Sequence, residues 1–507
     1  MTITRLAIIY SRAGAGLDAP LVSVEAHISR GLPRLSIVGL PEAEVKESKD
    51  RVRSAILNSQ FEFPPLRITI NLAPADLPKE GGRFDLPIAL GILAASGQLS
   101  LARITDYEFA GELALSGQLR PFKGALPFAI ATRKAKRALI IPHENSFEAA
   151  MPQDNLVYPA KTLAEVCKHL ENTKLLKPFV FMPPKEEPTI TTQIDMADIQ
   201  GQPFAKRALE IAAAGRHSVL FCGPPGTGKT MLASRLPTIM PALTTEEALE
   251  VAAVYSLSQP TISRLRWRQR PFRTPHHTAS AIAMVGGGSH PKPGEISLAH
   301  HGVLFLDELP EYERSVLEVL REPMEAGSII ISRAARKAVF PAQFQLIAAM
   351  NPCPCGQLGN PSKQCRCSSE QIARYQAKIS SPLLDRIDMH IAVPVITAEL
   401  LTETSTVNNE TSATIRARVQ AAMHLQQQRS KKSNSMLSNN EIKITCQLNA
   451  ESKDVIKKAI ERLSLSARSF YRVLKVARTI ADLAGTPQIE TMHLNEALGF
   501  RARNTCC

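Results

Sequence analysis

The pattern of hydrophobic and polar positions changes near Asp198. From there on, short apolar runs alternate with helical patterns, as in chains where helices cover both faces of a parallel sheet. The runs at 218–222, 303–306 and 344–350 are expected to be buried strands. The pattern therefore predicts an α/β fold for this part of the chain.

The residues before this change mix shorter strand-like and helical runs, which is typical of an α+β domain. We expect strands at 68–71 and 138–142 and helices at 86–98 and 127–136. A proline-rich stretch of mixed charge follows and predicts a linker. After residue 450 the pattern is helical. The chain is thus expected to divide into an N-terminal domain at 1–170, a linker at 171–194, an α/β core at 195–395 and a helical domain at 396–507.

A phosphate-binding motif directly follows the strand expected at 218–222. Residues 223–230 read Gly-Pro-Pro-Gly-Thr-Gly-Lys-Thr and match G-x-x-x-x-G-K-[ST]. Backbone N–H groups of such a loop surround phosphate, and the next helix presents its positive N-terminal end to the same anion. Lys229 would contact the β- and γ-phosphates, and Thr230 would hold Mg²⁺. The motif predicts ATP binding by Gly223, Pro224, Pro225, Gly226, Thr227, Gly228, Lys229 and Thr230.

Polar residues also follow the other two expected strands. Asp307 is expected to hold the magnesium ion, and Glu308 to orient and deprotonate the attacking water. The alternative is a helix whose first turn carries acids, which the helix dipole favours. Asn351 can position water at the γ-phosphate, and the Asn-Pro pair also favours a turn.

Two arginines further along are candidates for stabilising charge in the transition state. Arg386 is a candidate arginine finger that acts on the ATP of a neighbouring subunit, which would make activity depend on a ring. The alternative is a structural pair with a nearby aspartate. Arg468 is the matching arginine of the helical domain, and Arg472, one helical turn later, is the alternative.

The charge balance favours an anionic partner. Lys and Arg total 60 against 47 Asp and Glu, a net charge of +13, and nucleic acid is the commonest partner of such chains. A merely solvated surface is the alternative. Arg333, Arg336 and Lys337 stand between two strand-like runs and predict a hairpin whose turn contacts DNA phosphates. A second candidate surface surrounds Trp267 with the arginines at 264, 266, 268, 270 and 273.

Four of the nine cysteines form two C-x-C pairs, Cys353 with Cys355 and Cys365 with Cys367. Four thiolates match a tetrahedral zinc site; a reduced cysteine-rich loop is the alternative. The histidine pairs at 276–277 and 300–301 are interpreted as packing residues near the nucleotide rather than a second metal site. Because no secretory signal, membrane span or disulfide framework is apparent, we expect a cytoplasmic protein.

Together these motifs resemble the AAA+ ATPases that include magnesium-chelatase subunits and MCM helicases. The resemblance covers about residues 198–500 and rests on the strings at 272–278 (Phe-Arg-Thr-Pro-His-His-Thr), 294–302 (Gly-Glu-Ile-Ser-Leu-Ala-His-His-Gly) and 383–386 (Leu-Leu-Asp-Arg). It implies a P-loop AAA+ αβα domain, a C-terminal helical lid and a homo-oligomeric ring, expected to be a hexamer.

The first 170 residues resemble a Lon-protease-like domain, through the segments at 111–121 and 138–145. Where the Lon pattern has a serine nucleophile, this chain has Gly-Gly-Arg-Phe-Asp at 81–85, and Leu126 stands where the partner lysine should fall. Ser–Lys chemistry needs both groups, so a non-proteolytic domain is expected.

End to end, the chain resembles the YifB/ComM family. The resemblance implies an ATP-dependent DNA motor for branch migration in recombination during natural transformation. A chelatase-like ATPase that remodels a protein partner stays the alternative.

Overall fold

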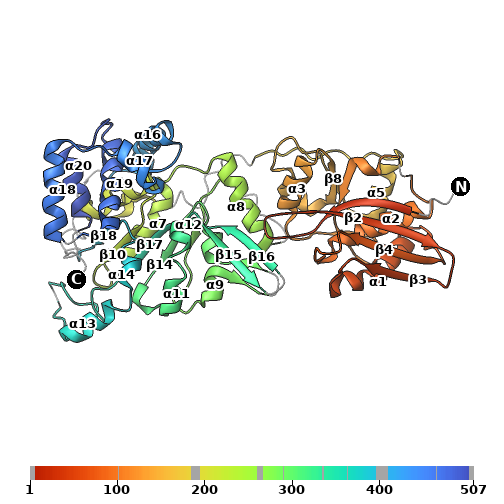
Figure 1. Ribbon diagram of the computed structural model, residues 1–507, viewed down its shortest axis with the longest axis horizontal. Coiled ribbons are helices and arrows are strands. Elements are labelled where there is room, and N and C mark those ends of the chain that lie inside the picture. The colour runs from red at the N-terminus through yellow and green to blue at the C-terminus, as the bar shows by residue number, and fades with distance from the viewer. Residues whose placement is uncertain are drawn as a thin grey trace.

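The structure is a computed structural model of an elongated chain, with the N-terminal region at one end and the C-terminal helices at the other (Figure 1). A parallel sheet lies between them. The structure describes residues 6–100, 102–183, 194–259, 267–288, 291–333, 336–361, 363–395, 409–463 and 465–501. Among these residues, no helix is long and apolar enough to cross a membrane, and the cysteines form no disulfide bond.

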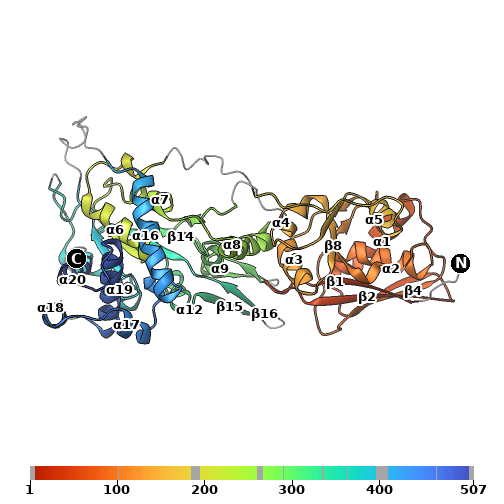
Figure 2. The same ribbon diagram turned by 90° about the horizontal axis from the view of Figure 1, so that it is seen from above.

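The N-terminal region contains two main sheets. Its elements are β1 (Leu6–Arg12), β2 (Leu21–Ser29), β3 (Arg34–Val38), α1 (Ala43–Asn58), β4 (Arg67–Ala73), η1 (Gly82–Phe84), α2 (Asp85–Ala95), η2 (Ile104–Asp106), β5 (Tyr107–Phe109), β6 (Glu112–Leu113), β7 (Leu119–Arg120), α3 (Ala125–Lys134), β8 (Ala138–Pro142), η3 (His143–Asn145), α4 (Ser146–Ala150), β9 (Val157–Ala160) and α5 (Leu163–Leu170). One sheet has the order β1-β2-β4-β3, with only β3 and β4 parallel, and the other is the parallel set β5-β8-β9. Burial alternates along β2 and β4, whereas α2 is buried throughout. The α2 helix is therefore the centre of this core (Figure 2).

The central region is built on a five-stranded parallel sheet. Its elements are η5 (Met196–Asp198), α6 (Pro203–Gly215), β10 (Val219–Cys222), α7 (Lys229–Ile239), α8 (Thr245–Ser258), β11 (Phe272–Arg273), α9 (Ala281–Val285), β12 (Gly286–Gly287), β13 (Lys292–Pro293), α10 (Glu295–Leu298), β14 (Val303–Leu306), η7 (Leu309–Glu311), α11 (Arg314–Glu318), α12 (Pro323–Ala326), β15 (Ser328–Arg333), β16 (Arg336–Pro341), β17 (Gln345–Met350), α13 (Ser369–Gln376), α14 (Ser381–Leu384) and β18 (Met389–Ala392). The strand order is β11-β14-β17-β10-β18. Strands β10, β14 and β17 are fully buried, as expected for a sheet covered on both faces. The predicted α/β fold and its three strands are confirmed.

The C-terminal helices extend the core of this sheet. They are α16 (Ser412–Ser430), η8 (Asn434–Met436), α17 (Asn439–Thr445), α18 (Ala450–Leu463), α19 (Ala467–Leu483) and α20 (Thr491–Gly499). Helices α16 and α19 pack against α6, and their apolar residues join one face of the sheet in a single core. Whether they act as a lid stays a prediction.

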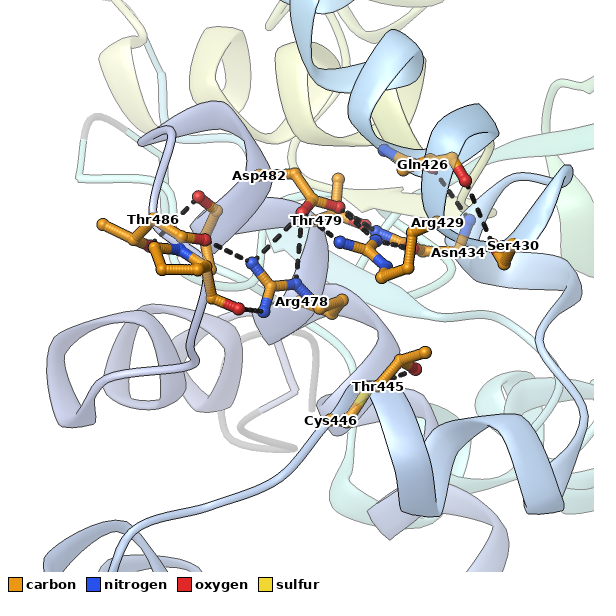
Figure 3. A network of polar contacts seen from close by, with 12 residues as sticks. Gln426, Arg429, Ser430, Asn434, Thr445, Cys446, Arg478, Thr479, Asp482 and Thr486 are labelled. Atoms are coloured by element: carbon orange, nitrogen blue, oxygen red, sulfur yellow. Dashed lines mark hydrogen bonds and ion pairs between the residues drawn. The ribbon is translucent and has the colours of Figure 1, made fainter.

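A buried polar network fixes α19 against α16 (Figure 3). The Asp482 carboxylate accepts bidentate hydrogen bonds from Arg429 at 2.8 Å each, and further ones from Asn434 and Arg478. A carboxylate buried with two guanidinium partners is well compensated. The network therefore holds the helix that carries Arg468 and Arg472 in a defined place.

Helix α8 joins the central region to the N-terminal region. Its residues Ala252 and Ala253 pack with Leu126 and Phe147 in a small apolar cluster, and Ser256 O accepts a hydrogen bond from Gly124 N at 2.9 Å. The two regions are thus in direct contact through α3, α4 and α8.

The first part of the predicted linker also packs on this junction. Phe179 N donates to Val157 O at 2.8 Å. The Phe181 ring packs edge to face on Trp267, with the ring centroids 5.3 Å apart. Residues 184–193 lie outside the described residues, so the linker and the domain boundaries stay predictions.

Candidate nucleotide-binding site

The strand order brings the phosphate-binding loop, Asp307 and Asn351 to one edge of the sheet. Strand β17 lies between β10 and β14. Since all three are parallel, their carboxyl ends lie side by side, with the phosphate-binding loop after β10, Asn351 after β17 and Asp307 after β14. Gly223 N donates to Met350 O at 3.2 Å. This edge is where ligands of open α/β sheets bind.

Lys229 lies at the centre of this edge. Its Nζ atom donates to Gly223 O at 2.6 Å, to Pro224 O at 2.9 Å and to Asn351 Oδ1 at 3.1 Å. Burial lowers the pKa of Lys229, while the nearby acids oppose this shift. The side chain thus links the phosphate-binding loop to Asn351, at the place where a phosphate would need a cation.

Thr230 and Asp307 supply paired oxygen ligands beside Lys229. Thr230 Oγ1 donates to Asp307 Oδ2 at 2.7 Å. A hydroxyl and a carboxylate at this separation fit the shell of a magnesium ion, which binds few protein oxygens and shares the rest with phosphate and water. The donor set therefore fits the predicted cofactor.

Glu308 has a backbone conformation that is uncommon for its residue type. Its φ is +52°, in the left-handed region, and its N–H donates to Asp307 Oδ1 at 2.9 Å. The side chain is 56% exposed, and its Oε2 lies 3.5 Å from His277 Nδ1. Unusual conformations of this kind cluster at functional sites. The His277 contact agrees with the interpretation of this histidine as a residue near the nucleotide.

Gln202 is a site residue that the sequence analysis missed. It has a φ of +51° and donates from Nε2 to Thr227 O at 2.7 Å. This contact ties the start of α6 to the phosphate-binding loop. A single glutamine before a helix gives no signal in the sequence.

Arg386 and Arg468 lie at the opposite edge of the sheet. Arg386 shortly precedes β18, and Asp388 N, two residues later, donates to Ser218 O at the start of β10. Arg386 Nη2 and Arg468 Nη2 both pair with Glu325 Oε1, at 3.0 and 3.1 Å. The sequence analysis did not foresee this shared carboxylate.

The two arginines line a cavity of about 660 Å³ between the sheet and the C-terminal helices. Its charged lining residues are Arg216, Glu325, Arg386, Asp388, Arg468, Arg472 and Lys475. Basic side chains outnumber acidic ones, so the cavity favours an anionic group. Arg468 is 47% exposed and Arg386 is 8% exposed.

Arg472 has a structural partner instead. It forms a short ion pair with Asp388. Burial works against the charged form of Asp388, but the Arg472 guanidinium, His217 and the Ser218 N–H outweigh it and hold the Asp388 pKa well below its usual value. Arg472 is 19% exposed against 47% for Arg468, so Arg468 is the more accessible of the two arginines considered in the helical domain, although it also pairs with Glu325.

The four clustered cysteines come together in space. Cys353 Sγ lies 3.5 Å from Cys355 Sγ and 3.6 Å from Cys365 Sγ, and Cys355 Sγ lies 3.6 Å from Cys365 Sγ. Cys367 completes a group whose ligand atoms all lie within 4.8 Å of one another. With Zn–S bonds of about 2.3 Å, a tetrahedral site has sulfurs about 3.8 Å apart. The spacing fits a tetrathiolate metal site.

Backbone N–H groups support these sulfurs. Leu358 N donates to Cys353 Sγ at 3.4 Å. The N–H groups of Gln357 and Arg366 lower the pKa of the Cys355 thiol to about 6, whereas burial and the neighbouring sulfurs raise the pKa values of the Cys365 and Cys367 thiols. Hydrogen bonds to the charged form of a thiol favour the thiolate, which is the form that binds metal.

A second group of possible metal ligands is better explained by packing. Glu250 Oε2 lies 3.0 Å from His300 Nε2 and 2.8 Å from His301 Nε2, and hydrogen bonds from these two rings hold the Glu250 pKa well below its usual value. Arg216 Nη2 lies 3.5 Å from the other ring nitrogen of His301. A guanidinium at this place disfavours a metal cation, so the interpretation of this histidine pair as packing residues is kept.

The predicted basic hairpin is present. Strands β15 and β16 pair antiparallel, with Arg333 opposite Arg336 in the register. Ile331 and Phe340 are buried in the core of the central region, and Ile330 on the outer face is 50% exposed. Residues 334 and 335 lie outside the described residues. Lys337, expected in the turn, instead lies in β16 opposite Ser332. DNA binding by the hairpin stays a prediction.

Part of the second candidate DNA surface makes contacts within the chain, whereas Arg268 is exposed. Trp267 packs on Phe181, Arg270 donates to His301 O at 2.7 Å, and Arg273 forms a bidentate pair with Glu295 at 2.6 and 2.7 Å. Residues 264 and 266 lie outside the described residues. The arginines at 270 and 273 are thus structural.

The segment at 81–85, which the sequence analysis compared with the Lon serine region, makes structural contacts. Asp85 is buried and pairs with Arg51 at 2.8 Å, and Arg83 Nη2 donates to Lys123 O at 3.1 Å. Burial, opposed by the Arg51 pair, raises the pKa of Asp85 to about 6. The absence of proteolysis stays a prediction.

The chain is similar to several known proteins. Three family models match the chain: "Subunit ChlI of Mg-chelatase" at residues 24–145, "Magnesium chelatase, subunit ChlI" at 195–401, and "Magnesium chelatase, subunit ChlI C-terminal" at 409–501. The competence protein ComM of Haemophilus influenzae is 53% identical over 98% of this chain and 97% of its own length. The YifB protein of Escherichia coli is 49% identical with the same coverage. The magnesium-chelatase 38 kDa subunit of Cereibacter sphaeroides is 25% identical over 30% of this chain and 51% of its own length.

Proposed function

The chain belongs to the YifB/ComM family of magnesium-chelatase-like AAA+ proteins, and on that basis we propose that it is a ring-forming ATPase that moves DNA strands. The reaction is ATP hydrolysis coupled to branch migration during homologous recombination, in the cytoplasm. The relative from Haemophilus influenzae is named for competence, which supports a role in natural transformation.

One observation carries the ATPase proposal: the candidate phosphate- and magnesium-binding side chains meet at one sheet edge. Lys229 contacts Asn351, and Thr230 contacts Asp307. Lys229 would bind the phosphates, while Thr230 and Asp307 would hold a magnesium ion that neutralises their charge. Glu308 would accept the proton of the attacking water, and Asn351 would hold that water in line.

The ring proposal rests on the position of the two arginines. Strand β10 has four residues, so its ends are roughly 13 Å apart at about 3.3 Å per residue. The phosphate-binding loop follows one end, and Arg386 and Arg468 lie near the other. They therefore cannot reach the phosphates of their own subunit. In a head-to-tail ring they would meet the ATP of the neighbour, and we propose a hexamer of this kind.

DNA is proposed as the partner on the basis of charge. The chain carries a net charge of +13, and three basic residues belong to the end of the β15–β16 hairpin. Arg333, Arg336 and Lys337 occupy the strand positions next to the turn. Repeated around a ring, these residues would contact phosphates without reading sequence. Branch migration moves through any sequence, so contacts of this kind suit it.

A structural zinc ion is proposed at the four cysteines. The support is the mutual spacing of the sulfurs and the N–H group of Leu358 that faces Cys353. Zinc bound by four thiolates has no open position for catalysis, so its role here is to hold the loop. Elemental analysis of protein purified without chelators should find about one zinc per chain.

The motor function is tested with a synthetic four-way DNA junction. The wild-type protein with ATP and magnesium should convert the junction into its two duplex products. Glu308→Gln should bind the junction and ATP but leave the junction intact, because only the hydrolysis step is removed. A wild-type protein that hydrolyses ATP but never converts the junction into duplexes would contradict the proposed DNA motor. It would favour an ATPase that remodels a protein partner.

A further inference from the structure

The four-cysteine loop begins and ends beside the nucleotide site. Cys353 comes two residues after Asn351, and α13 begins two residues after Cys367. Helix α13 then returns to the start of the loop: Gln376 Nε2 donates to Pro352 O at 3.2 Å, and Tyr375 is hydrogen-bonded to the Asn351 backbone. The loop is therefore closed on the segment that carries Asn351.

The loop also touches the phosphate-binding loop directly. Gly356 packs against Pro225 so closely that a methyl group at Gly356 would lie 2.7 Å from Pro225 Cδ and 3.2 Å from its Cγ. A proline ring is covalently tied to its own backbone and cannot swing aside as a flexible side chain can. A shift of the cysteine loop toward Pro225 would therefore displace the backbone that would surround the phosphates.

The shape of the loop depends on what links its sulfurs. Between 353 and 367 the described residues form no helix or strand, so few backbone hydrogen bonds hold the loop. A metal bound to both C-x-C pairs would close it, and removing the metal would return the conformational freedom of a loop of this length. The contacts at Pro225 and Asn351 would then loosen together.

We infer that the metal held by Cys353, Cys355, Cys365 and Cys367 is a clamp on the ATP site, which positions Pro225 from one side and Asn351 from the other. This inference rests on the proposed ATPase and zinc site, and it assigns the metal a role in nucleotide binding in addition to holding the cysteine loop. A chain without the metal should keep its fold, because the loop lies outside the hydrophobic cores apart from Cys353. It should bind and hydrolyse ATP poorly.

Two glycines in the loop offer a matched test. Gly356 and Gly359 have nearly the same positive φ, +76° and +75°, so alanine strains the backbone equally at both. A methyl group at Gly359 meets no atom within 4 Å, whereas one at Gly356 collides with Pro225. The two variants differ in the contact with the phosphate-binding loop and leave all four cysteines in place.

The experiment measures zinc content and the affinity for a fluorescent ATP analogue in the full-length protein. We expect Gly356→Ala to keep about one zinc per chain and to bind the analogue about tenfold more weakly, the scale of an overpacked contact. Gly359→Ala should match the wild type in both. Removing zinc from the wild type with a chelator should weaken nucleotide binding as well, and adding zinc back should restore it.

The clamp is refuted if Gly356→Ala binds the analogue as tightly as Gly359→Ala, or if metal-free wild-type protein binds it normally. Either result leaves the ATPase itself standing, because the wild type would still bind and hydrolyse ATP. A wild type that binds no nucleotide with zinc in place would instead reject the proposed function.

Discussion

Replacing the two arginines at the far edge of the sheet tests whether ATP is hydrolysed between subunits. Arg386→Ala and Arg468→Ala should each bind ATP normally, since neither arginine lies near the phosphate-binding loop of its own chain. Turnover should nevertheless fall by about 10³–10⁵-fold, the contribution of an arginine that stabilises charge on the transferred phosphoryl group.

The structural cost of these changes is small by comparison. Arg386 donates to Pro382 O at 2.9 Å and pairs with Glu325, whose side chain is 44% exposed. When Arg386 is removed, Arg468 still neutralises that carboxylate. The loss should therefore be about 1–2 kcal/mol of unfolding free energy, a typical value for one hydrogen bond and one partly exposed pair. Arg374→Ala is the matched control, because among the described residues Arg374 forms an ion pair only with exposed Glu370 and its loss should change neither turnover nor stability.

The assay mixes Arg386→Ala subunits with Lys229→Ala subunits. An interface is intact when the first variant supplies the phosphate-binding loop and the second supplies the arginine. In an equal, random mixture about one quarter of the head-to-tail interfaces meet this condition, so activity should rise well above that of either variant alone. Mixtures that never exceed the separate variants at any ratio would refute action across the interface.

Four further changes test other parts of the account. Glu308→Gln should bind ATP but turn over at least about 10²-fold more slowly, as when a general base is lost; near-normal hydrolysis would reject its role. Cys365→Ser should lower the zinc content below about one ion per chain, and an unchanged zinc content would contradict the proposed zinc site. Replacing Arg336 and Lys337 together by Ala should leave basal ATPase activity intact while DNA binding weakens for all sequences and depends less on salt; unchanged DNA affinity would place the DNA path elsewhere. Burial raises the pKa of Glu148 from 4.5 to about 8. The protonated carboxyl therefore contributes folding stability that is fully present below pH 4.5 and is lost as pH rises through about 8. The wild-type melting temperature should fall across that window and that of Glu148→Gln should fall less, whereas parallel curves would contradict the assigned pKa.

The sheet and the nucleotide site could be predicted because their signals are local. An apolar run followed by a phosphate-binding motif specifies β10 and the loop at 223–230, and the same reasoning found β14 and β17. The pairing of Lys229 with Asn351 depends on β17 lying between the other two strands. No single run of residues specifies that order.

The features that the sequence analysis missed depend on distant packing. Glu325 contacts two arginines only because α12, the residues before β18 and the start of α19 converge at one edge of the sheet. Phe179 and Phe181 lie in a proline-rich stretch that is typical of a linker, yet the described part of that stretch packs on the N-terminal region. Local composition favours an extended segment in such a case, and tertiary contacts override it.

The central claim is that ATP hydrolysis by this chain is coupled to DNA. The most direct measurement is the steady-state ATPase rate of the full-length protein, with and without a branched DNA junction, at fixed protein and magnesium concentrations. The account predicts strong stimulation by the junction that weakens as salt rises, because phosphate contacts carry the binding. A rate that the junction leaves unchanged at low salt would contradict it and favour a chelatase-like ATPase that acts on a protein partner.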